Sequence, residues 1–269
     1  MDLRAHPSSV IDPRARVGAD VVIGPFCSVG PEVALGDGAA LVSHVALMGE
    51  TEIGPRTKIF PFATIGAPSQ DLKSAGDRGS VVVGADCLIR EGVTINAGTR
   101  AGGEVTRVGD GCALLAGSHV AHDCQLGARV VLANNVLLGG HVELGDDVAI
   151  GGGAAVHQHV RIGQLAFVAG LAGVEGDAPP FTLVGGDRAH LFGLNLVGLH
   201  RRGFCEGRIE RLKRAYRTLF SHKIQASRDE RLACAAALAD DDGDIAALVA
   251  FMCAPSKRTL IAPRPPGSR

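Results

Sequence analysis

A branched aliphatic residue recurs at every sixth position over most of this chain. Ten consecutive sixth positions from Ile11 hold Ile, Leu or Val, three do so from Val83, and twelve do so from Val108. This period matches neither the 3.6 residues of a helical turn nor the alternation of an extended strand. The sequence therefore predicts a repeating unit of one short strand followed by a bend.

Three such hexads close one triangular coil, and stacked coils form three parallel sheets around a narrow interior. We expect the aliphatic residue and the small residue four places later to point inward. Gly is common at the bends, where a positive φ angle or a close backbone approach is needed. The composition agrees with a narrow interior, since the 269 residues include 37 Gly but only 4% aromatic residues. The predicted fold class is therefore mainly β.

The seven cysteines form no CxxC pair and show no spacing typical of zinc ligands. Cys27, Cys87, Cys112 and Cys124 occupy the inward slot four residues after the aliphatic. We expect the cysteines to be reduced and buried as small hydrophobic residues.

Two polar, glycine-rich segments interrupt the repeat, residues 67–80 and residues 100–106. Loops that leave a rigid solenoid commonly carry binding groups. The repeat then reaches the sequence DAPPF at 177–181, where we expect the coil to stop because Pro cannot donate to a strand ladder. The sequence thus predicts a β-helix domain over residues 1–190 with two loop insertions.

The C-terminal part, residues 191–269, has helical character. Residues 208–222 place apolar side chains on one stripe with Arg and Lys opposite. The Ala- and Leu-rich segment 228–253 is divided into two helices by Gly243. We expect a small α-helical domain that ends in a disordered tail with the sequence RPPGSR.

Charge and hydropathy exclude several classes of protein. The formal net charge is −1, which argues against nucleic-acid binding. Apolar residues make up 46% of the chain, which excludes a disordered protein. The chain has no run of 18 apolar residues, and its N-terminal MDLRAHPSSV lacks a signal-peptide core. We expect a soluble protein of the cytoplasm.

Five of the ten histidines, together with one acid, one glycine and one amide, gather at one predicted corner of the solenoid. Residues 18 apart in the sequence stack about 4.8 Å from one another in successive coils. This spacing gives two columns and two flanking residues: His122, Gly140 and Gln158 in the first column, Asp123, His141 and His159 in the second, and His119 and His157 beside them. None of the histidines takes an inward position, so they are not predicted to be core residues.

The histidine corner has the features of a general-base site. An imidazole titrates near neutral pH, and the carboxylate of Asp123 or a backbone carbonyl can orient it. Two alternatives remain open, a polar corner that merely tolerates histidine and a metal site. For a metal site the sequence has neither an HxxxH pair on a helix nor a Cys/His set.

Several motifs resemble one family of hexapeptide-repeat acyltransferases. They are, in chain order, QDLK (70–73), HVAHDC (119–124), LANNVLLGGHV (132–142), GGGAAVHQ (151–158) and GLHRRGF (198–204). The family is that of the acyl-carrier-protein-dependent UDP-N-acetylglucosamine O-acyltransferases, which start lipid A biosynthesis, and the resemblance covers essentially the whole chain. It implies a left-handed parallel β-helix with a small C-terminal α-helical domain, assembled as a homotrimer.

The same resemblance implies the reaction. A (R)-3-hydroxyacyl chain would pass from acyl carrier protein to the 3-hydroxyl of UDP-N-acetylglucosamine. We expect neither a metal nor a cofactor, because the donor is itself a phosphopantetheine-linked carrier.

The resemblance also implies roles for individual residues. His122 would be the general base, Asp123 would orient its imidazole, and the backbone N–H of Gly140 would stabilise the oxyanion. Gly170 would bound the acyl-chain groove. The substrate-binding residues would be Asp71, Lys73, His119, His141, His157, Gln158, Asn195, Arg201 and Arg202.

Asn96 departs from the family pattern, because the best-known members have His at this position. Some relatives acylate a 3-amino analogue of the sugar, so the choice between oxygen and nitrogen as acceptor stays open. A different hexapeptide acyltransferase and a non-enzymatic solenoid scaffold also remain compatible with the repeat.

Basic residues cluster at the start of the helical region. Such a cluster could dock an acidic carrier protein by charge complementarity, or it could be a solvated helix face. Its members are Arg201, Arg202, Arg208, Arg211, Lys213, Arg214 and Arg217.

Overall fold

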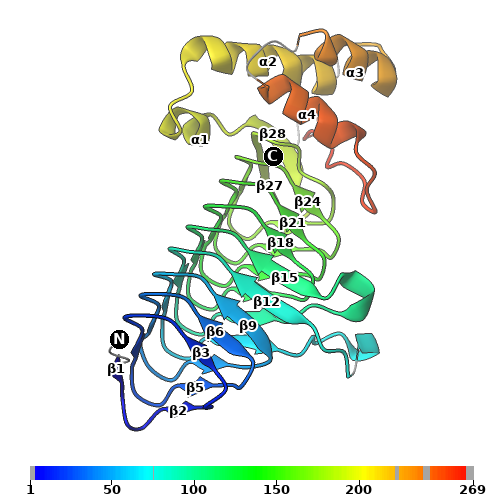
Figure 1. The fold of residues 1–269 in the computed structure, drawn as a ribbon. Helices are drawn as coiled ribbons and strands as arrows, with labels where there is room; N and C mark the ends of the chain where they lie inside the picture. The colour runs from blue at the N-terminus through cyan, green and yellow to red at the C-terminus, as the bar shows by residue number, and fades with distance from the viewer. Residues whose placement is uncertain (1–3, 75, 222–223, 239–242, 265–269) are drawn as a thin grey trace.

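A tube of stacked coils makes up most of the molecule, and helices lie beyond its C-terminal end (Figure 1). The computed structural model describes residues 4–74, 76–221, 224–238 and 243–264. Each coil contributes one short strand to each of three sheets, as the hexad repeat predicts. The chain is therefore a parallel β-helix with a helical C-terminal part.

The three sheets are here named A, B and C. Sheet A contains, in spatial order, β1(Arg4–Ala5), β4(Val22–Ile23), β7(Ala40–Leu41), β10(Lys58–Ile59), β13(Leu88–Ile89), β16(Ala113–Leu114), β19(Val131–Leu132), β22(Ala149–Ile150), β25(Phe167–Val168), β27(Thr182–Gly185) and β28(His190–Leu194). Sheet B contains β2(Val10–Ile11), β5(Ser28–Val29), β8(Ala46–Leu47), β11(Thr64–Ala67), β14(Thr94–Asn96), β17(His119–Val120), β20(Leu137–Leu138), β23(Ala155–Val156) and β26(Gly173–Val174). Sheet C contains β3(Arg16–Val17), β6(Val33–Leu35), β9(Glu50–Ile53), β12(Ser80–Val83), β15(Val105–Val108), β18(Gln125–Leu126), β21(Glu143–Leu144) and β24(Arg161–Ile162).

Parallel pairing aligns equivalent residues of successive coils. In sheet B, Val120 pairs with Leu138 and Leu138 pairs with Val156, at the expected interval of 18 residues. Ile65 pairs instead with Ile95, because a loop is inserted between those two coils. The loops thus lengthen the interval and leave the register of the inward column intact.

The interior of the tube holds the aliphatic column and the small residues four places after it. Ile89, Leu114 and Leu132 are fully buried, and so are Val136 and Ala154 in the second inward slot. These side chains belong to one continuous core along the tube. The prediction of which residues point inward is therefore confirmed.

The cysteine prediction is confirmed in the solenoid and wrong beyond it. Cys27, Cys87, Cys112 and Cys124 are buried in the inward slot. The remaining cysteines lie in or beside the C-terminal helices, where no hexad slot holds them, and they are exposed: Cys205, Cys234 and Cys253.

Two loops leave the solenoid near the middle of the tube, where the repeat is interrupted in the sequence. The first contains the short 3₁₀ helix η1(Leu72–Ser74), and the second contains η2(Arg100–Gly102). They touch one another, since the backbone N–H of Arg100 donates a 3.0 Å hydrogen bond to the Asp77 carboxylate. The loop insertions thus form one structure beside the coils.

The coil continues past the proline-containing segment 177–181, so the expectation that it stops there is wrong. Ala178 bridges Ile162 of sheet C, and β27 pairs in parallel with β25. Pro180 occupies the bend position two residues after the inward residue, where the ladder uses no N–H and where Pro25 and Pro55 also stand. Proline is compatible with this slot because no hydrogen bond is lost there.

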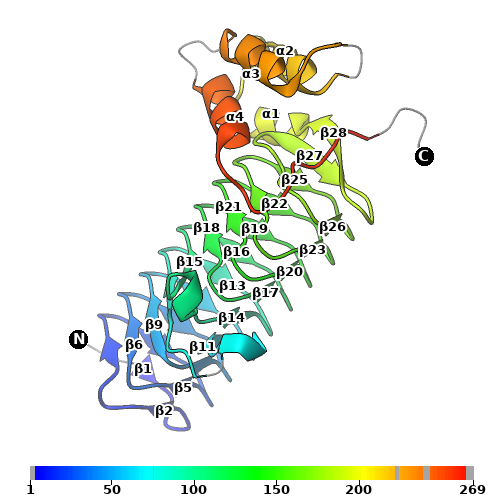
Figure 2. The ribbon, with the colours of Figure 1, turned by 90° about the vertical axis from the view of Figure 1, so that its right-hand side faces the viewer.

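The tube ends in a hairpin, since β28 pairs antiparallel with β27. Residues 191–194 are therefore extended, whereas the sequence predicted helical character from residue 191, and the expected boundary after residue 190 falls inside β28. The C-terminal segment returns to this end, where Leu260 bridges Asp177 and Pro263 bridges Leu191. Figure 2 shows this segment, coloured red, running back along the coils.

The C-terminal part contains, within the described residues, the helices α1(Leu196–Arg201), α2(Glu206–Phe220), α3(Arg228–Ala236) and α4(Asp244–Cys253). A second core holds them together and contains Leu199, Ile209, Leu212 and Leu248. Gly243 has a φ of 72° at the start of α4 and separates it from α3, as predicted. His222 and the tail from residue 265 lie outside the described residues.

No helix in the part of the chain that the structure describes is both long enough and apolar enough to cross a membrane.

Neighbouring leucines in β20 provide a direct test of the inward slot. Leu138 is 1% exposed inside the tube, whereas Leu137 is 51% exposed on the outer face. Leu138→Ala should lower the free energy of unfolding by about 2–5 kcal/mol, because it leaves a cavity in a close-packed column. Leu137→Ala should lower it far less. Urea unfolding measures both, and equal losses would contradict the assigned facing of the strand.

Candidate active site

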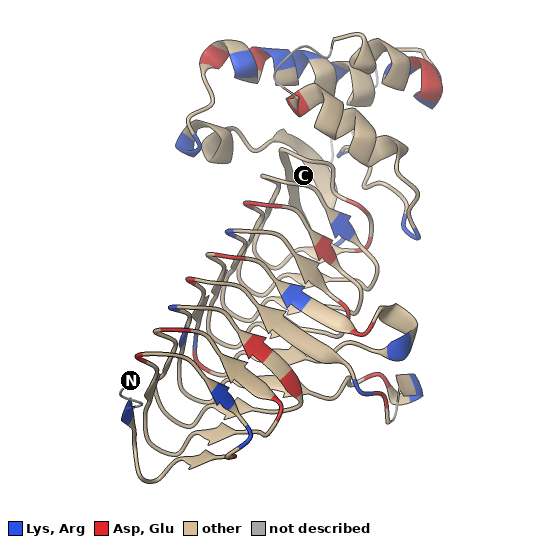
Figure 3. Ribbon diagram, viewed as in Figure 1, with Lys and Arg blue, Asp and Glu red and all other residues tan. Residues whose placement is uncertain are grey.

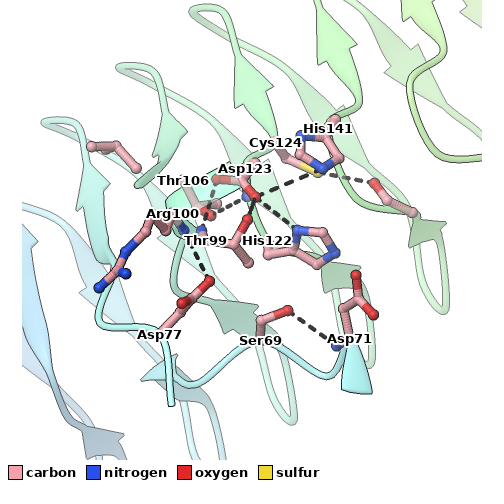
Figure 4. Close-up of polar contacts among 12 residues, drawn as sticks. Ser69, Asp71, Asp77, Thr99, Arg100, Thr106, His122, Asp123, Cys124 and His141 are labelled. Carbon is pink, nitrogen blue, oxygen red and sulfur yellow. Dashed lines mark hydrogen bonds and ion pairs between the residues drawn. The ribbon is translucent and has the colours of Figure 1, made fainter. Parts of the chain in front are cut away.

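The corner between sheets B and C brings the predicted histidines together. His122, Gly140 and Gln158 each follow a paired strand of sheet B at the same distance, so they stack in successive coils. Asp123, His141 and His159 occupy the next position, where the backbone has φ angles of 61°, 60° and 63°. Both predicted columns are present, and Figure 4 shows three of their members, His122, Asp123 and His141.

His122 and Asp123 form a hydrogen-bonded pair. Nδ1 of His122 lies 2.8 Å from Oδ2 of Asp123. The Asp123 side chain is fully buried, and the His122 side chain is 11% exposed. A carboxylate only accepts hydrogen bonds, so the pair places the proton on Nδ1 and leaves the lone pair of Nε2 free. This is the protonation state that a histidine base requires.

Gly140 lies directly against the free edge of this imidazole. A methyl group in place of its hydrogen would be 2.5 Å from Nε2 of His122, so no other residue fits without a shift of the ring. Within the described residues the Gly140 N–H donates no hydrogen bond, because it occupies the bend slot that the ladder leaves unused. A free N–H beside a free imidazole nitrogen can bind an oxygen that becomes negatively charged.

The second loop holds Asp123 in place. Thr99 donates to both carboxylate oxygens, from its backbone N–H at 2.9 Å and from its hydroxyl at 2.6 Å. Sequence reasoning missed Thr99. The only signal near it is the interruption of the repeat that begins at residue 100.

Three further histidines surround the pair. The rings of His122 and His141 meet edge to face, with centroids 5.0 Å apart, and His141 stacks on His159 at 4.3 Å. His119 makes a 2.7 Å hydrogen bond with Thr94 on the outer face of sheet B. Burial lowers the pKa of His119, His141 and His159, and nearby histidines lower it further. These rings therefore favour the neutral form.

The first loop contributes Asp71 to the same corner. Figure 4 shows its side chain beside His122, and its charge acts to raise the pKa of His141 against the effect of burial. Its carboxylate also accepts a 3.0 Å hydrogen bond from the backbone N–H of Lys73, whose side chain is exposed. The loop insertion thus places one predicted substrate-binding residue near His122 and His141.

The C-terminal segment closes the upper end of the corner. The Arg258 guanidinium contacts Nδ1 of His157 and donates to the backbone carbonyl of Gln158 at 2.9 Å. A cavity of about 460 Å³ lies between this segment and the corner, lined by His141, Glu143, His159, Arg161, Pro255, Ser256 and Lys257. Sequence reasoning also missed Arg258 and Lys257, because no pattern connects them with residues 100 positions away.

The predicted residues of the helical part lie elsewhere in the chain. Asn195 caps α1, since its side chain accepts from Gly198 and donates to the carbonyl of Leu165. Arg202 pairs with Asp147 at the corner between sheets C and A. One chain therefore does not bring Arg202 to the corner that holds His122.

Most of the basic cluster lies on α2, where Figure 3 shows Lys and Arg interspersed with acidic residues. Arg208 is bound to Asp244 of α4 at 2.7 Å, and Lys213 is bound to Glu210 at 2.6 Å. Part of the cluster therefore stabilises the helical core, and its charge is partly balanced.

Gly170 lies at the third corner, between sheets A and B, in the same slot as Gly152. Leu171 beside it is 80% exposed. The outer face of sheet B connects this corner with the His122 corner. Asn96, by contrast, is buried beneath the first loop, where its side chain donates to the carbonyls of Ala67 and Pro68.

Stacked hexapeptide coils with a His–Asp pair at one corner are typical of the hexapeptide-repeat transferases. Residues 106–140 match the family model of the bacterial transferase hexapeptide, and residues 177–261 match the second domain of UDP-N-acetylglucosamine O-acyltransferase.

Curated relatives and solved structures narrow the class to one family. The acyl-[acyl-carrier-protein]–UDP-N-acetylglucosamine O-acyltransferase of Rhizobium johnstonii is 42% identical over 97% of this chain and 95% of the relative. The enzyme of the same name from Azorhizobium caulinodans is 48% identical, over 95% and 96%. The crystal structure of the Moraxella catarrhalis UDP-N-acetylglucosamine O-acyltransferase superposes with a TM-score of 0.91 at 37% identity, over 96% of this chain and 99% of that one.

The chain belongs to the acyl-[acyl-carrier-protein]–UDP-N-acetylglucosamine O-acyltransferase family and is an acyltransferase. The resemblance seen in the sequence motifs is confirmed, and so is the left-handed parallel β-helix with a small helical C-terminal part.

The lowered pKa values make folding stability depend on pH. Below the ordinary histidine pKa of about 6.5, the unfolded chain binds protons that folded His119 and His141 resist. The free energy of unfolding should therefore be highest above that pH and fall as the pH drops through the lowered folded-state values. Each group contributes at most about 1.4 kcal/mol per unit of pKa shift.

Urea unfolding at about pH 7.5 and about pH 5.5 measures this loss. His119→Gln removes one of the titrating groups and should make the loss smaller than in the wild type. An equal loss in both proteins would contradict the assigned role of His119.

Proposed function

We propose that this protein transfers a (R)-3-hydroxyacyl chain from acyl carrier protein to the 3-hydroxyl of UDP-N-acetylglucosamine, the first step of lipid A biosynthesis, with His122 as general base. One observation carries the proposal: Asp123 holds Nδ1 of His122, while the Nε2 edge of the ring lies against Gly140, whose N–H donates no hydrogen bond within the described residues. A base and an oxyanion donor are thus adjacent. Family membership supports the choice of donor and acceptor.

The reaction proceeds by direct transfer. Nε2 of His122 takes the proton of the sugar hydroxyl as its oxygen attacks the thioester carbonyl. The oxyanion that forms accepts a hydrogen bond from Gly140. When the intermediate collapses, the carbon–sulfur bond breaks, and the imidazolium returns the proton to the departing phosphopantetheine thiolate. No acyl-enzyme is needed, and Cys124 beside the pair is buried in the tube, where burial raises its thiol pKa to about 12.

The other residues of the corner hold the sugar and the diphosphate. Asp71 and Lys73 contact the glucosamine and the acyl region, and His119, His141, His157 and Gln158 line the path of the nucleotide sugar. Support comes from the first loop, whose Asp71 charge reaches His141, and from the exposed position of His157 and Gln158.

The active unit is a homotrimer in which a neighbouring copy supplies Asn195, Arg201 and Arg202 to the nucleotide or the phosphopantetheine arm. Arg202 and His122 lie at different corners of one chain, so a second copy is required to bring them together. The first loop carries Leu72, which is 93% exposed, as expected of a residue that packs against another copy.

The acyl chain lies along the outer face of sheet B and ends near Gly170. This face connects the two corners, and Gly152 and Gly170 at its far end carry no side chains. Arg214 and Arg217, which are exposed on α2, would face the carrier protein.

Four alternatives remain. The first is a 3-amino sugar as the acceptor, which the departure at Asn96 leaves open. The second is a different hexapeptide acyltransferase, which would use another acyl donor. A metal-dependent reaction would use His122, Asp123 and His141, whose ligand atoms lie within 4.8 Å of one another.

We propose that neither a metal nor a cofactor takes part, and metal analysis with chelation tests this. A non-enzymatic scaffold would have no turnover. Location in the cytoplasm stays a prediction from the sequence.

Purified protein incubated with acyl carriers of graded chain length and with both nucleotide sugars tests the proposal, with mass spectrometry of the products. We expect an O-acylated UDP-N-acetylglucosamine. His122→Ala should fold normally and lower kcat by about 10²- to 10⁴-fold, because a positioned base contributes that much.

Near-normal turnover of His122→Ala would overturn the assignment of the base. A product formed only with the 3-amino sugar would favour the nitrogen acceptor, and no product with either sugar would contradict the proposed function.

A further inference from the structure

The Asp123 side chain is more deeply buried than the side chain in the same slot of the next coil. Its side chain is 0% exposed, whereas that of His141, one coil further in the same slot, is 24% exposed. The difference comes from the second loop, which closes over this one position of the corner. A buried carboxylate needs hydrogen-bond donors to offset the loss of water.

Thr99 is the residue of the loop that supplies these donors. Its backbone N–H binds Oδ1 of Asp123, and its hydroxyl binds Oδ2, the oxygen that also accepts from His122. Thr99 itself is 1% exposed. The hydroxyl therefore fixes the carboxylate oxygen that in turn fixes the imidazole.

Two further contacts close the arrangement. Gly102 lies so near that a methyl group on it would be 2.1 Å from the Asp123 carboxyl carbon. The Thr106 hydroxyl accepts a 2.8 Å hydrogen bond from the Asp123 backbone N–H, where the chain has a positive φ angle. The loop thus leaves the carboxylate one orientation, and the orientation is the one that faces His122.

We propose that Thr99 is a positioning residue for the reaction: its hydroxyl holds Asp123 so that His122 keeps its proton on Nδ1 and its lone pair on Nε2. The expected effect on kcat rests on the proposed function. The expected effect of Thr99 on the tautomer of His122 does not depend on the identity of the substrate. Thr99 does not touch His122 and acts only through Asp123.

The loss of the hydroxyl has a predictable effect on the pair. In Thr99→Val the shape is kept and the backbone N–H still binds Oδ1, but Oδ2 retains only its 2.8 Å hydrogen bond with His122 and a longer, 3.9 Å contact with Nε2 of His141. The carboxylate can then tilt away from the ring, and small misplacements of a catalytic group cost up to about 100-fold in rate. Substrate contacts are untouched, so the loss belongs in kcat rather than in KM.

The first experiment compares Thr99→Val with Thr99→Ser and with Thr57→Val. Thr57 is a fully buried threonine remote from the site, whose hydroxyl donates to Gly84 at 2.8 Å and accepts from Cys87 at 3.0 Å. We expect Thr99→Val to lower kcat by about 10- to 100-fold with KM within about twofold. Thr99→Ser should restore most of the rate, and Thr57→Val should lose stability without this loss of kcat. Wild-type kcat in Thr99→Val would overturn the inference.

The second experiment needs no activity. The imidazole ¹⁵N shifts of His122 should report one tautomer, with Nδ1 protonated, in the wild type and in Thr57→Val. In Thr99→Val they should move toward a mixture of tautomers. Gly102→Ala adds a methyl group that would push on the same carboxylate while Thr99 stays intact, and it should do the same.

The two experiments separate the two possible failures. If the wild type transfers no acyl chain but Thr99→Val shifts the tautomer of His122, then the proposed function is wrong and the positioning role stands. If the wild type is active and depends on His122, while Thr99→Val retains both the wild-type tautomer and kcat, then Thr99 has no positioning role.

Discussion

The backbone hydrogen-bond ladder between successive coils determines where every corner residue lies. Val120 pairs with Leu138, so the two residues that follow each of them also stack. His122 therefore lies against Gly140 although no bond joins them. The buried aliphatic column selects this register, since a slip of one residue would turn the column toward solvent. The placement of the His122–Asp123 pair against Gly140 is therefore a consequence of core packing inside the tube.

The two loops that interrupt the repeat bury and orient side chains at the corner, which the backbone ladder alone does not do. A regular coil leaves its corner side chains partly exposed, as His141 is. The second loop buries Asp123 and gives it two donors from Thr99, and the first loop brings Asp71 to the same place. A rigid scaffold with two short insertions thus provides both the stacking and the orientation that a histidine base needs.

The sequence predicted the parts of the structure that follow from periodicity. The inward slots and the alignment of His122 with Gly140 depend only on a count of residues. The contact of Thr99 with Asp123 depends instead on the path of a loop, and that of Arg258 with Gln158 on the return of the C-terminal segment, and neither leaves a periodic signal. The prediction that the coil stops at residues 177–181 is wrong because Pro180 occupies a bend slot whose N–H the ladder does not use.

We propose that the acyl chain passes from the thioester to the sugar hydroxyl at a site between Nε2 of His122 in one coil and the amide of Gly140 in the next. A crystal structure of the protein with its acylated nucleotide sugar measures this directly. We expect the acylated sugar oxygen to lie within about 3.2 Å of Nε2 of His122, and the ester carbonyl oxygen to lie within the same distance of the Gly140 nitrogen. An ester bound at another corner, or a carbonyl oxygen that points away from Gly140, would contradict it.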